Sequence, residues 1–314
     1  MATCSLLTCG IEDDRTFDRH DYESARARWC PGCGDHAVLA AMQKLLAVEQ
    51  LRPERTVFVS GIGCSSRFPH YMKTYGFHGL HGRALPVATG VKLHRPDLDV
   101  FVVMGDGDCC SIGAAHWIHA IRYNMKMVVL LLDNNIYALT KKQTSPTTRQ
   151  GTTSNTQPLG SYLPALNPLT VALGVTNASF IAQSAEWSPP HLEATLRAAF
   201  AHPGFAFVRV LQRCPVYMPE NFKAAVTDRS LVEMLVDPKG IDAPQLASVY
   251  TARRHDPGDL DAARRLAGDE QPLRLGLFYS DPTRPRYEET RHRPLRTAQE
   301  KITLLDKELD RYAV

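Results

Sequence analysis

Residues 100–137 read VFVVMGDGDCCSIGAAHWIHAIRYNMKMVVLLLDNNIY. Two apolar runs, 100–104 and 127–133, flank a stretch of helical character, and neither run alternates apolar with polar residues. Strands that are buried on both faces of a sheet have this pattern. The order strand, helix, strand predicts a parallel βαβ unit. A short polar loop follows each run at once.

The same alternation continues on both sides of this unit. Further strands are predicted at 56–60, 205–211 and 275–279, and helices at 37–48, 112–123 and 191–201. Asp35 is expected to cap the first of these helices. We therefore predict an α/β fold with a doubly wound parallel sheet. Ligands of such sheets bind at the loops that follow the carboxyl ends of the strands.

Composition excludes several protein classes. The 314 residues are 44% hydrophobic and 22% charged, with a net charge of +3, which is typical of globular proteins rather than disordered or fibrous ones. This charge is too small to indicate a nucleic acid or a membrane as partner. No apolar run approaches the roughly 20 residues that span a bilayer, and no secretory signal is visible. We expect a cytoplasmic protein.

The charge density rises toward the C-terminus. Residues 252–314 contain 13 Lys or Arg and 12 Asp or Glu. We expect one cofactor-binding domain over 1–240 and a charged C-terminal extension over 241–314 that packs on the core or on a partner subunit. Residues 297–312 place four apolar side chains at helical spacing, which fits either a surface helix packed by one stripe or a helix that docks on a partner.

The two polar loops carry groups that suit a diphosphate and a cation. In Gly105-Asp-Gly-Asp108, the glycines let backbone amides approach a phosphate, and Asp106 can reach a divalent cation. Magnesium prefers hard oxygen ligands. Asn134 offers an amide oxygen and Ile136 a backbone carbonyl, and adjacent parallel strands would bring both loops to one edge. The combination predicts a diphosphate and magnesium site.

Eight cysteines indicate metal or redox chemistry in a reducing compartment. Cys30 and Cys33 form a CxxC motif before a predicted helix, Cys64 lies in the loop after strand 56–60, and Cys214 follows strand 205–211. Four such thiolates suit a 4Fe–4S cluster or a zinc ion equally well. The other four are expected to be packing thiols (Cys109 and Cys110) or bystanders (Cys4 and Cys9), with a second cluster left open.

The chain resembles the β subunits of 2-oxoacid:ferredoxin oxidoreductases over nearly its whole length. The motifs that carry the resemblance are WCPGCGDH at 29–36, SGIGCSS at 60–66, HGRALPVATG at 81–90, GDGD at 105–108, DNNIY at 133–137, TSPT at 144–147 and GLFYSDPTRPRYEE at 276–289. Two departures stand out. Residues 140–143 read TKKQ where family members often have TGGQ or TKGQ, and residues 113–116 read GAAH in place of GGNH.

The resemblance implies three cofactors and their ligands. Cys30, Cys33, Cys64 and Cys214 would hold one 4Fe–4S cluster. The side chains of Asp106 and Asn134 and the carbonyl of Ile136 would hold Mg²⁺. Thiamine diphosphate would be lined by Ile62, Gly63, Cys64, Ser65, His81, Gly107, Asp108, Ala138 and Leu139.

The resemblance also implies a reaction and partners. A 2-oxoacid would be oxidatively decarboxylated to acyl-CoA and CO₂, and electrons would pass through the cluster to ferredoxin or another acceptor. An α subunit would supply the pyrimidine-binding domain, so the chain alone should be inactive. Two alternatives stay open: a cluster-free thiamine diphosphate decarboxylase or synthase subunit, and a non-catalytic electron-transfer subunit.

Cationic side chains near the loops favour a dicarboxylate substrate. Arg67 follows the Cys64 loop, and Lys141 and Lys142 follow the predicted magnesium loop. A guanidinium matches a carboxylate in a bidentate arrangement, whereas the methyl group of pyruvate offers no counter-charge. We therefore expect 2-oxoglutarate as the substrate. Arg67 is the candidate for its distal carboxylate, and His81 is the candidate for a substrate oxygen.

Overall fold

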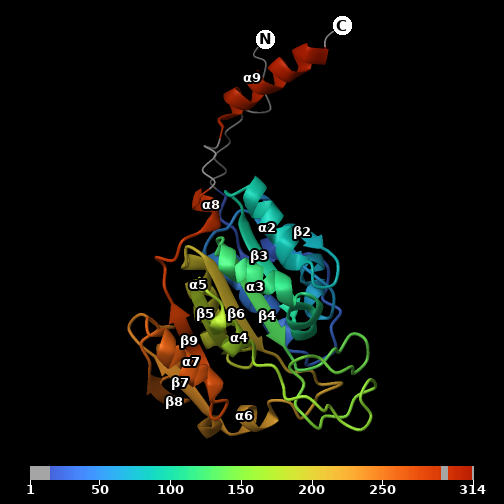
Figure 1. The fold of residues 1–314 in the computed structure, drawn as a ribbon, viewed down its shortest axis with the longest axis vertical. Helices are drawn as coiled ribbons and strands as arrows, with labels where there is room; N and C mark the ends of the chain where they lie inside the picture. The colour runs from blue at the N-terminus through green and yellow to red at the C-terminus, as the bar shows by residue number, and fades with distance from the viewer. Residues whose placement is uncertain (1–14, 291–295, 313–314) are drawn as a thin grey trace.

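A nine-stranded sheet forms the centre of the protein, with the strand order β2-β1-β3-β4-β6-β5-β9-β7-β8 (Figure 1). The computed structural model describes residues 15–290 and 296–312. The strands are β1 (Thr56–Ser60), β2 (Tyr75–His78), β3 (Asp99–Gly105), β4 (Met127–Asp133), β5 (Phe180–Ala185), β6 (Phe205–Leu211), β7 (Val232–Val236), β8 (Thr251–Arg254) and β9 (Leu273–Ser280).

The predicted α/β fold with a doubly wound sheet is confirmed. The six strands from β2 to β5 pair in parallel, and every residue of β1, β4 and β5 is buried. One pairing was not anticipated. Strand β9 runs antiparallel to β5, and β7 and β8 follow the direction of β9.

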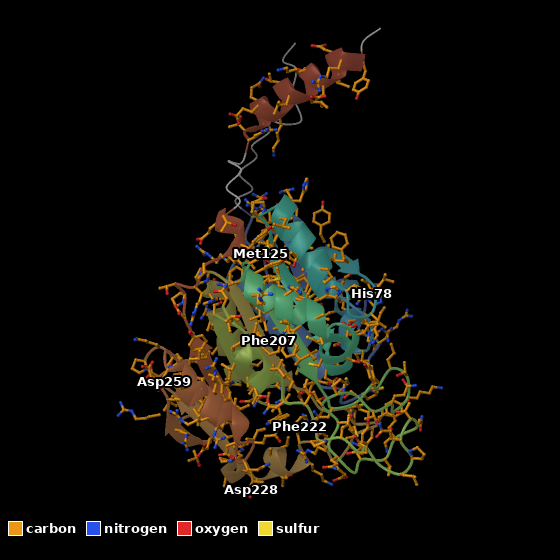
Figure 2. All side chains as sticks on the ribbon, viewed as in Figure 1. His78, Met125, Phe207, Phe222, Asp228 and Asp259 are labelled. Carbon is orange, nitrogen blue, oxygen red and sulfur yellow. The ribbon has the colours of Figure 1, made fainter. Side chains whose placement is uncertain are left out.

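Helices cover both faces of the sheet. They are α1 (Asp35–Val48), α2 (Ala84–His94), α3 (Ala114–Tyr123), α4 (Pro168–Gly174), α5 (Pro189–Ala201), α6 (Lys223–Thr227), α7 (Leu260–Gly268), α8 (Tyr287–Thr290) and α9 (Ala298–Leu309). Along β3, Val102 packs in the core shared with α2 and α3, while Phe101 and Val103 pack in the core shared with α1 and α5. Because side chains of a strand alternate between faces, continuous apolar strands supply both cores. Phe207, at the centre of Figure 2, belongs to the first core.

Two local predictions about helices are wrong. Helix α1 begins at Asp35 itself, its N-cap is Gly34, and no capping hydrogen bond forms. The predicted helix 112–123 is interrupted at Gly113, where the π-helical turn Asp108–Ile112 ends and α3 begins one residue later. A Cβ atom on Gly113 would lie 2.5 Å from the Asp108 carbonyl oxygen, so the turn closes tightly at this glycine.

The segment after residue 240 contributes to the sheet as well as extending from it. Strand β9 pairs with β5 and β7, and β8 pairs with β7. Helix α9 buries none of its residues, and Leu305, Leu309 and Tyr312 are exposed. Of the described helices, none combines the length and the apolar character needed to cross a bilayer.

Candidate functional site

Three loops meet at the carboxyl ends of β1, β3 and β4, which are neighbours in the sheet. The loops pack so closely that two glycines are required. A Cβ atom on Gly61 would lie 2.0 Å from Oδ2 of Asp108, and one on Gly107 would lie 2.0 Å from the ring of Tyr137. The hydroxyl of Tyr137 donates to the Gly107 carbonyl at 2.9 Å. The loop after β3 is therefore held against the loop after β4.

Asp108 joins the loops after β1 and β3 to the turn before α2. Its Oδ1 accepts hydrogen bonds from the backbone N–H groups of Gly82 at 2.7 Å and Ile62 at 3.2 Å. The same atom lies 2.6 Å from Nδ1 of His81. Burial raises the pKa of Asp108 although these donors act in the opposite direction. Because Asp108 binds Nδ1, Nε2 is the His81 nitrogen that remains for a ligand.

Asp106 is a buried carboxylate without a cationic partner among the described residues. Its Oδ2 accepts from the hydroxyl of Thr147 at 2.7 Å and from Ser145. Burial, and then repulsion from Asp133, raises the pKa of Asp106 to about 7. Asp133 differs because Arg209 pairs with it at 2.6 Å. An uncompensated buried carboxylate fits a divalent cation.

The two other predicted magnesium ligands follow β4, next to Asp106. The Oδ1 atom of Asn134 accepts from the N–H of Ile136 at 3.1 Å, which fixes the turn between them. Both residues are buried. The register pairs Gly105 of β3 with Leu132 of β4, so the residues that follow the two strands start from the same level of the sheet.

The residues predicted to line thiamine diphosphate differ in exposure. Ser65 and Ala138 are buried, whereas Ile62 and Leu139 are exposed by 36% and 48%. Gly63 adopts φ +126°, and a Cβ atom there would meet nothing within 4 Å. Open space beside backbone that only glycine adopts readily suits the close approach of a ligand. The residues present therefore fit a diphosphate-bearing cofactor.

The four predicted cluster cysteines gather around Cys64. Cys64 packs with Cys214 beside Ile136 and Ala138. Burial, followed by the neighbouring charges of Asp35, Cys214 and Cys30, raises the pKa of Cys64 to about 12. Burial also raises the pKa of the Cys33 thiol, and the Cys64 thiolate acts in the same direction. Binding to iron would overcome this effect, because a metal holds cysteines in the thiolate form.

Neighbouring polar groups hold the cysteine segments in place. The indole N–H of Trp29 donates to the Cys64 carbonyl at 2.7 Å, and the side-chain amide of Gln212 donates to the Cys33 sulfur at 3.3 Å. Within the described ranges, no three His, Cys, Asp or Glu side chains stand at the spacing that would hold a metal ion. Cys109 and Cys110 are buried beside the first core, whereas Cys4 and Cys9 lie outside the described residues.

Arg67 lies in a cationic pocket of about 450 Å³. Its guanidinium stacks over Tyr71 at 5.9 Å from the ring centroid. The pocket is lined by Ala25, Arg26, Arg28, Ile62, Gly63, Arg67, His70, Tyr71, His78 and Leu139. Lys141 and Lys142, which were also expected near the substrate, do not line this pocket. The positive charges beside Arg67 are Arg26 and Arg28, which precede the CxxC motif.

Sequence reasoning missed several polar residues around the site. Ser145 and Thr147 contact Asp106, and Arg209 pairs with Asp133. Asp35 is buried, and the Cys33 thiol lies beside its carboxyl group. Burial raises the pKa of Asp35 to about 7. The TSPT motif was a signal for Ser145 and Thr147. Nothing in the local sequence connects Arg209 with Asp133, which lies 76 residues earlier.

Comparison with known proteins identifies the family. Residues 61–210 match the family model for the C-terminal TPP-binding domain of thiamine pyrophosphate enzymes. The chain is 49% identical over 197 residues to 2-oxoglutarate oxidoreductase subunit KorB of Mycobacterium tuberculosis, an alignment that covers 63% of this chain and 52% of that protein. It thus spans about half the length of that relative.

Two further relatives match over most of their length. The β subunit of 2-oxoacid:ferredoxin oxidoreductase 1 from Aeropyrum pernix is 38% identical over 269 residues, which are 83% of this chain and 80% of that one. The solved structure of 2-oxoglutarate:ferredoxin oxidoreductase from Magnetococcus marinus, with 2-oxoglutarate, coenzyme A and succinyl-CoA bound, has a TM-score of 0.79 and 34% identity. That match covers 94% of this chain and 97% of that one. The chain belongs to the β subunits of the 2-oxoacid:ferredoxin oxidoreductases.

Proposed function

We propose that this chain, together with an α subunit, oxidatively decarboxylates a 2-oxoacid to acyl-CoA and CO₂ and passes the electrons to ferredoxin or another carrier. The carrying observation is that a buried carboxylate without a cation, Asp106, and a group of cysteines around Cys64 border the same three loops. When bound, thiamine diphosphate supplies an electron sink for decarboxylation, and a 4Fe–4S cluster accepts single electrons.

The residues of the three loops would hold these groups. Asp106, Asn134 and the Ile136 carbonyl would bind Mg²⁺, and the open space beside Gly63 would admit the diphosphate. His81, fixed by Asp108, would present Nε2 to an oxygen of the substrate. The other residues proposed to line the cofactor are Ile62, Gly63, Cys64, Ser65, Gly107, Asp108, Ala138 and Leu139.

We propose a 4Fe–4S cluster rather than zinc on Cys30, Cys33, Cys64 and Cys214. In a cubane cluster each thiolate binds its own iron, so the sulfurs stand further apart than around one ion. The reaction also needs an acceptor of single electrons, which zinc cannot be. A reducing cytoplasm, where free cysteines persist, is the compartment we propose for the enzyme.

The α partner and the substrate complete the proposal. The carboxylate that activates the pyrimidine ring of the cofactor would come from the α subunit, which makes the β chain half of an active site. We propose 2-oxoglutarate as the substrate because Arg26, Arg28 and Arg67 line one pocket, and none of its described lining residues is a carboxylate. A second carboxylate on the oxoacid would supply the missing negative charge.

Reconstitution tests the function. The α subunit, this chain and their mixture are each given coenzyme A, an electron acceptor and either 2-oxoglutarate or pyruvate under anaerobic conditions. We expect coenzyme A-dependent reduction of the acceptor only in the mixture, and faster reduction with 2-oxoglutarate. Turnover by this chain alone would contradict the shared active site. Equal rates with both oxoacids would contradict the substrate assignment.

A further inference from the structure

The TSPT motif at 144–147 runs beside the loops after β3 and β4 and places two hydroxyl groups on Asp106. The Oγ1 atom of Thr147 lies 2.7 Å from Oδ2 of Asp106 and 2.9 Å from Oδ1 of Asp133. The Ser145 hydroxyl reaches the same Oδ2 atom. Thr147 and Ser145 are both buried. One threonine hydroxyl thus stands between two buried carboxylates.

The Thr147 hydroxyl has one hydrogen and two possible acceptors, Asp106 and Asp133. The other hydrogen-bond partners of Asp133 decide between them. The Oδ1 atom of Asp133 already accepts from the backbone N–H of Asn135 at 3.1 Å and from its side-chain amide at 2.9 Å. Its Oδ2 atom accepts from Arg209 at 2.8 Å. Among the side chains of the described residues, only the two hydroxyls donate to Asp106. The Thr147 hydroxyl therefore donates its hydrogen bond to Asp106.

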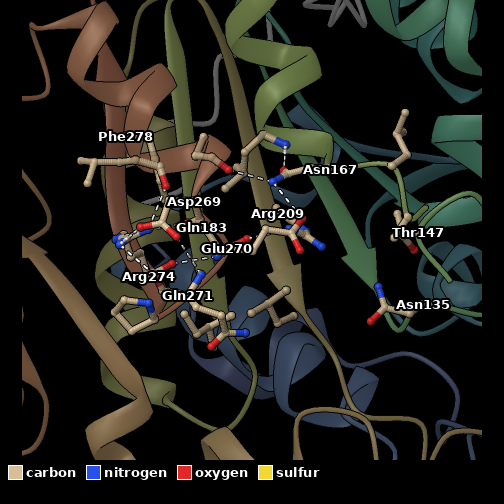
Figure 3. A pocket seen from close by; sticks show the side chains of 18 of the residues that line it. Asn135, Thr147, Asn167, Gln183, Arg209, Asp269, Glu270, Gln271, Arg274 and Phe278 are labelled. Carbon is tan, nitrogen blue, oxygen red and sulfur yellow. Dashed lines mark hydrogen bonds and ion pairs between the residues drawn. The ribbon is translucent and has the colours of Figure 1, made fainter. Parts of the chain in front are cut away.

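Asp133 is held in turn by side chains on the neighbouring strands β6 and β5. Figure 3 shows Arg209 and Thr147 in the lining of one pocket of about 90 Å³, together with Gln183 and Arg274. Arg209 donates to Gln183 at 3.2 Å, and Gln183 donates to the Arg274 carbonyl on β9 at 2.7 Å. Because Arg209 neutralises Asp133, the charge of Asp106 is the one left for a cation.

We infer that Thr147, with Ser145, is a positioning residue for the magnesium ligand Asp106. Both hydroxyls bind Oδ2, and no other side chain in the described part of the chain donates to Oδ1, so Oδ1 is the oxygen that would bind the cation. Groups that orient metal ligands in this way typically change metal affinity ten- to a hundred-fold when they are removed. This inference rests on the proposed binding of magnesium and thiamine diphosphate.

Magnesium titration of the purified αβ complex, stripped of metal and saturated with thiamine diphosphate, tests the inference by calorimetry. Thr147→Val keeps the shape of the side chain and removes the hydroxyl, so we expect magnesium to bind ten- to a hundred-fold more weakly. Thr147→Ser restores the hydroxyl and should bind within about threefold of the parent. Thr144→Val is the matched control, because the Thr144 hydroxyl bonds Ser154 and not Asp106.

The outcomes separate the inference from the proposed function. A parent complex that binds neither magnesium nor the cofactor overturns both. A parent that binds, with equal magnesium affinity in Thr147→Val, overturns the positioning role alone. If Thr147→Val does not assemble, Ser145→Ala removes the other hydroxyl on Oδ2 and should weaken magnesium binding several-fold; unchanged affinity in that variant overturns the inference as well.

Discussion

At the residue scale, the site is built from charges that lack their usual partners. Arg26, Arg28 and Arg67 form no ion pair with any described residue, and they line the same pocket. Asp106 is buried and has no cationic partner among residues 15–290 and 296–312, whereas Asp133 next to it is neutralised by Arg209. An unpaired charge is costly when it is buried, unless a ligand compensates it. A cation at Asp106 would do so. Arg26 and Arg28 are exposed to solvent, so the arginines offer an anion an open cationic surface rather than a buried charge.

The pocket predicts how Arg67 affects substrate choice. If Arg67 binds the distal carboxylate of 2-oxoglutarate, Arg67→Leu should lower kcat/KM for this substrate by about ten- to a hundred-fold, the scale of one charge-assisted hydrogen bond. The rate with pyruvate should change much less. Steady-state kinetics of the αβ complex with both oxoacids measures this. Arg229→Leu is a matched control for the loss of one exposed positive charge, because Arg229 does not line this pocket. Equal losses for both oxoacids would make Arg67 a structural residue.

At the element scale, strands were easier to predict than the contacts between loops. The predicted strands 56–60, 127–133 and 205–211 match β1, β4 and β6 at both ends. Their continuous apolar runs leave no alternative to burial on both faces. Strands β2 and β8 were missed because every residue in them is exposed. Strands β5 and β7 were missed because polar residues interrupt their apolar runs, although β5 is fully buried. Contacts such as Thr147 with Asp106 depend on tertiary packing between residues 41 positions apart.

The end of β6 supplies a test of the cysteine group. Cys214 follows β6 and packs against Cys64, which is 150 residues earlier in the chain. Cys214→Ala should abolish or strongly alter the paramagnetic resonance signal of the reduced protein, because a cubane cluster needs all four thiolates. Cys110→Ala is the control, since Cys110 lies in the π-helical turn and packs in the core shared with α2 and α3. An unchanged signal in Cys214→Ala would remove this residue from the ligand set.

At the scale of the whole molecule, the C-terminal strand β9 is connected to the site through side-chain hydrogen bonds. Strand β9 is joined through Gln183 and Arg209 to Asp133. The buried Asn124 donates to the carbonyls of Arg284 and Pro285 and accepts from the N–H of Phe205. Composition alone did not show this attachment, because a charged segment can still contain one apolar strand. Residues after 240 thus take part in the core.

Two buried histidines predict how stability depends on pH. Burial lowers the pKa of His191 and of His202 to about 4, below the 6.5 of an exposed histidine. Between about pH 6.5 and 4 the unfolded chain therefore binds more protons, and stability falls as pH falls. The raised pKa values of Asp35 and Asp106 act in the opposite direction.

A variant separates these opposing contributions. His202→Gln removes one histidine, so between pH 8 and pH 5 the parent should lose about 2 kcal/mol more free energy of unfolding than the variant. Urea unfolding of the full chain at both pH values measures the difference. The absolute stability of the variant does not matter for this comparison. Parallel pH profiles would show that His202 is not buried as a neutral ring.

The central claim is that this chain holds a 4Fe–4S cluster and thiamine diphosphate at one edge of its sheet. Iron, acid-labile sulfide, zinc and thiamine diphosphate are quantified together on the αβ complex purified without oxygen. The account predicts about four iron and four sulfide per β chain, with one thiamine diphosphate and no stoichiometric zinc. Stoichiometric zinc without sulfide, or a cluster without thiamine diphosphate, would contradict it.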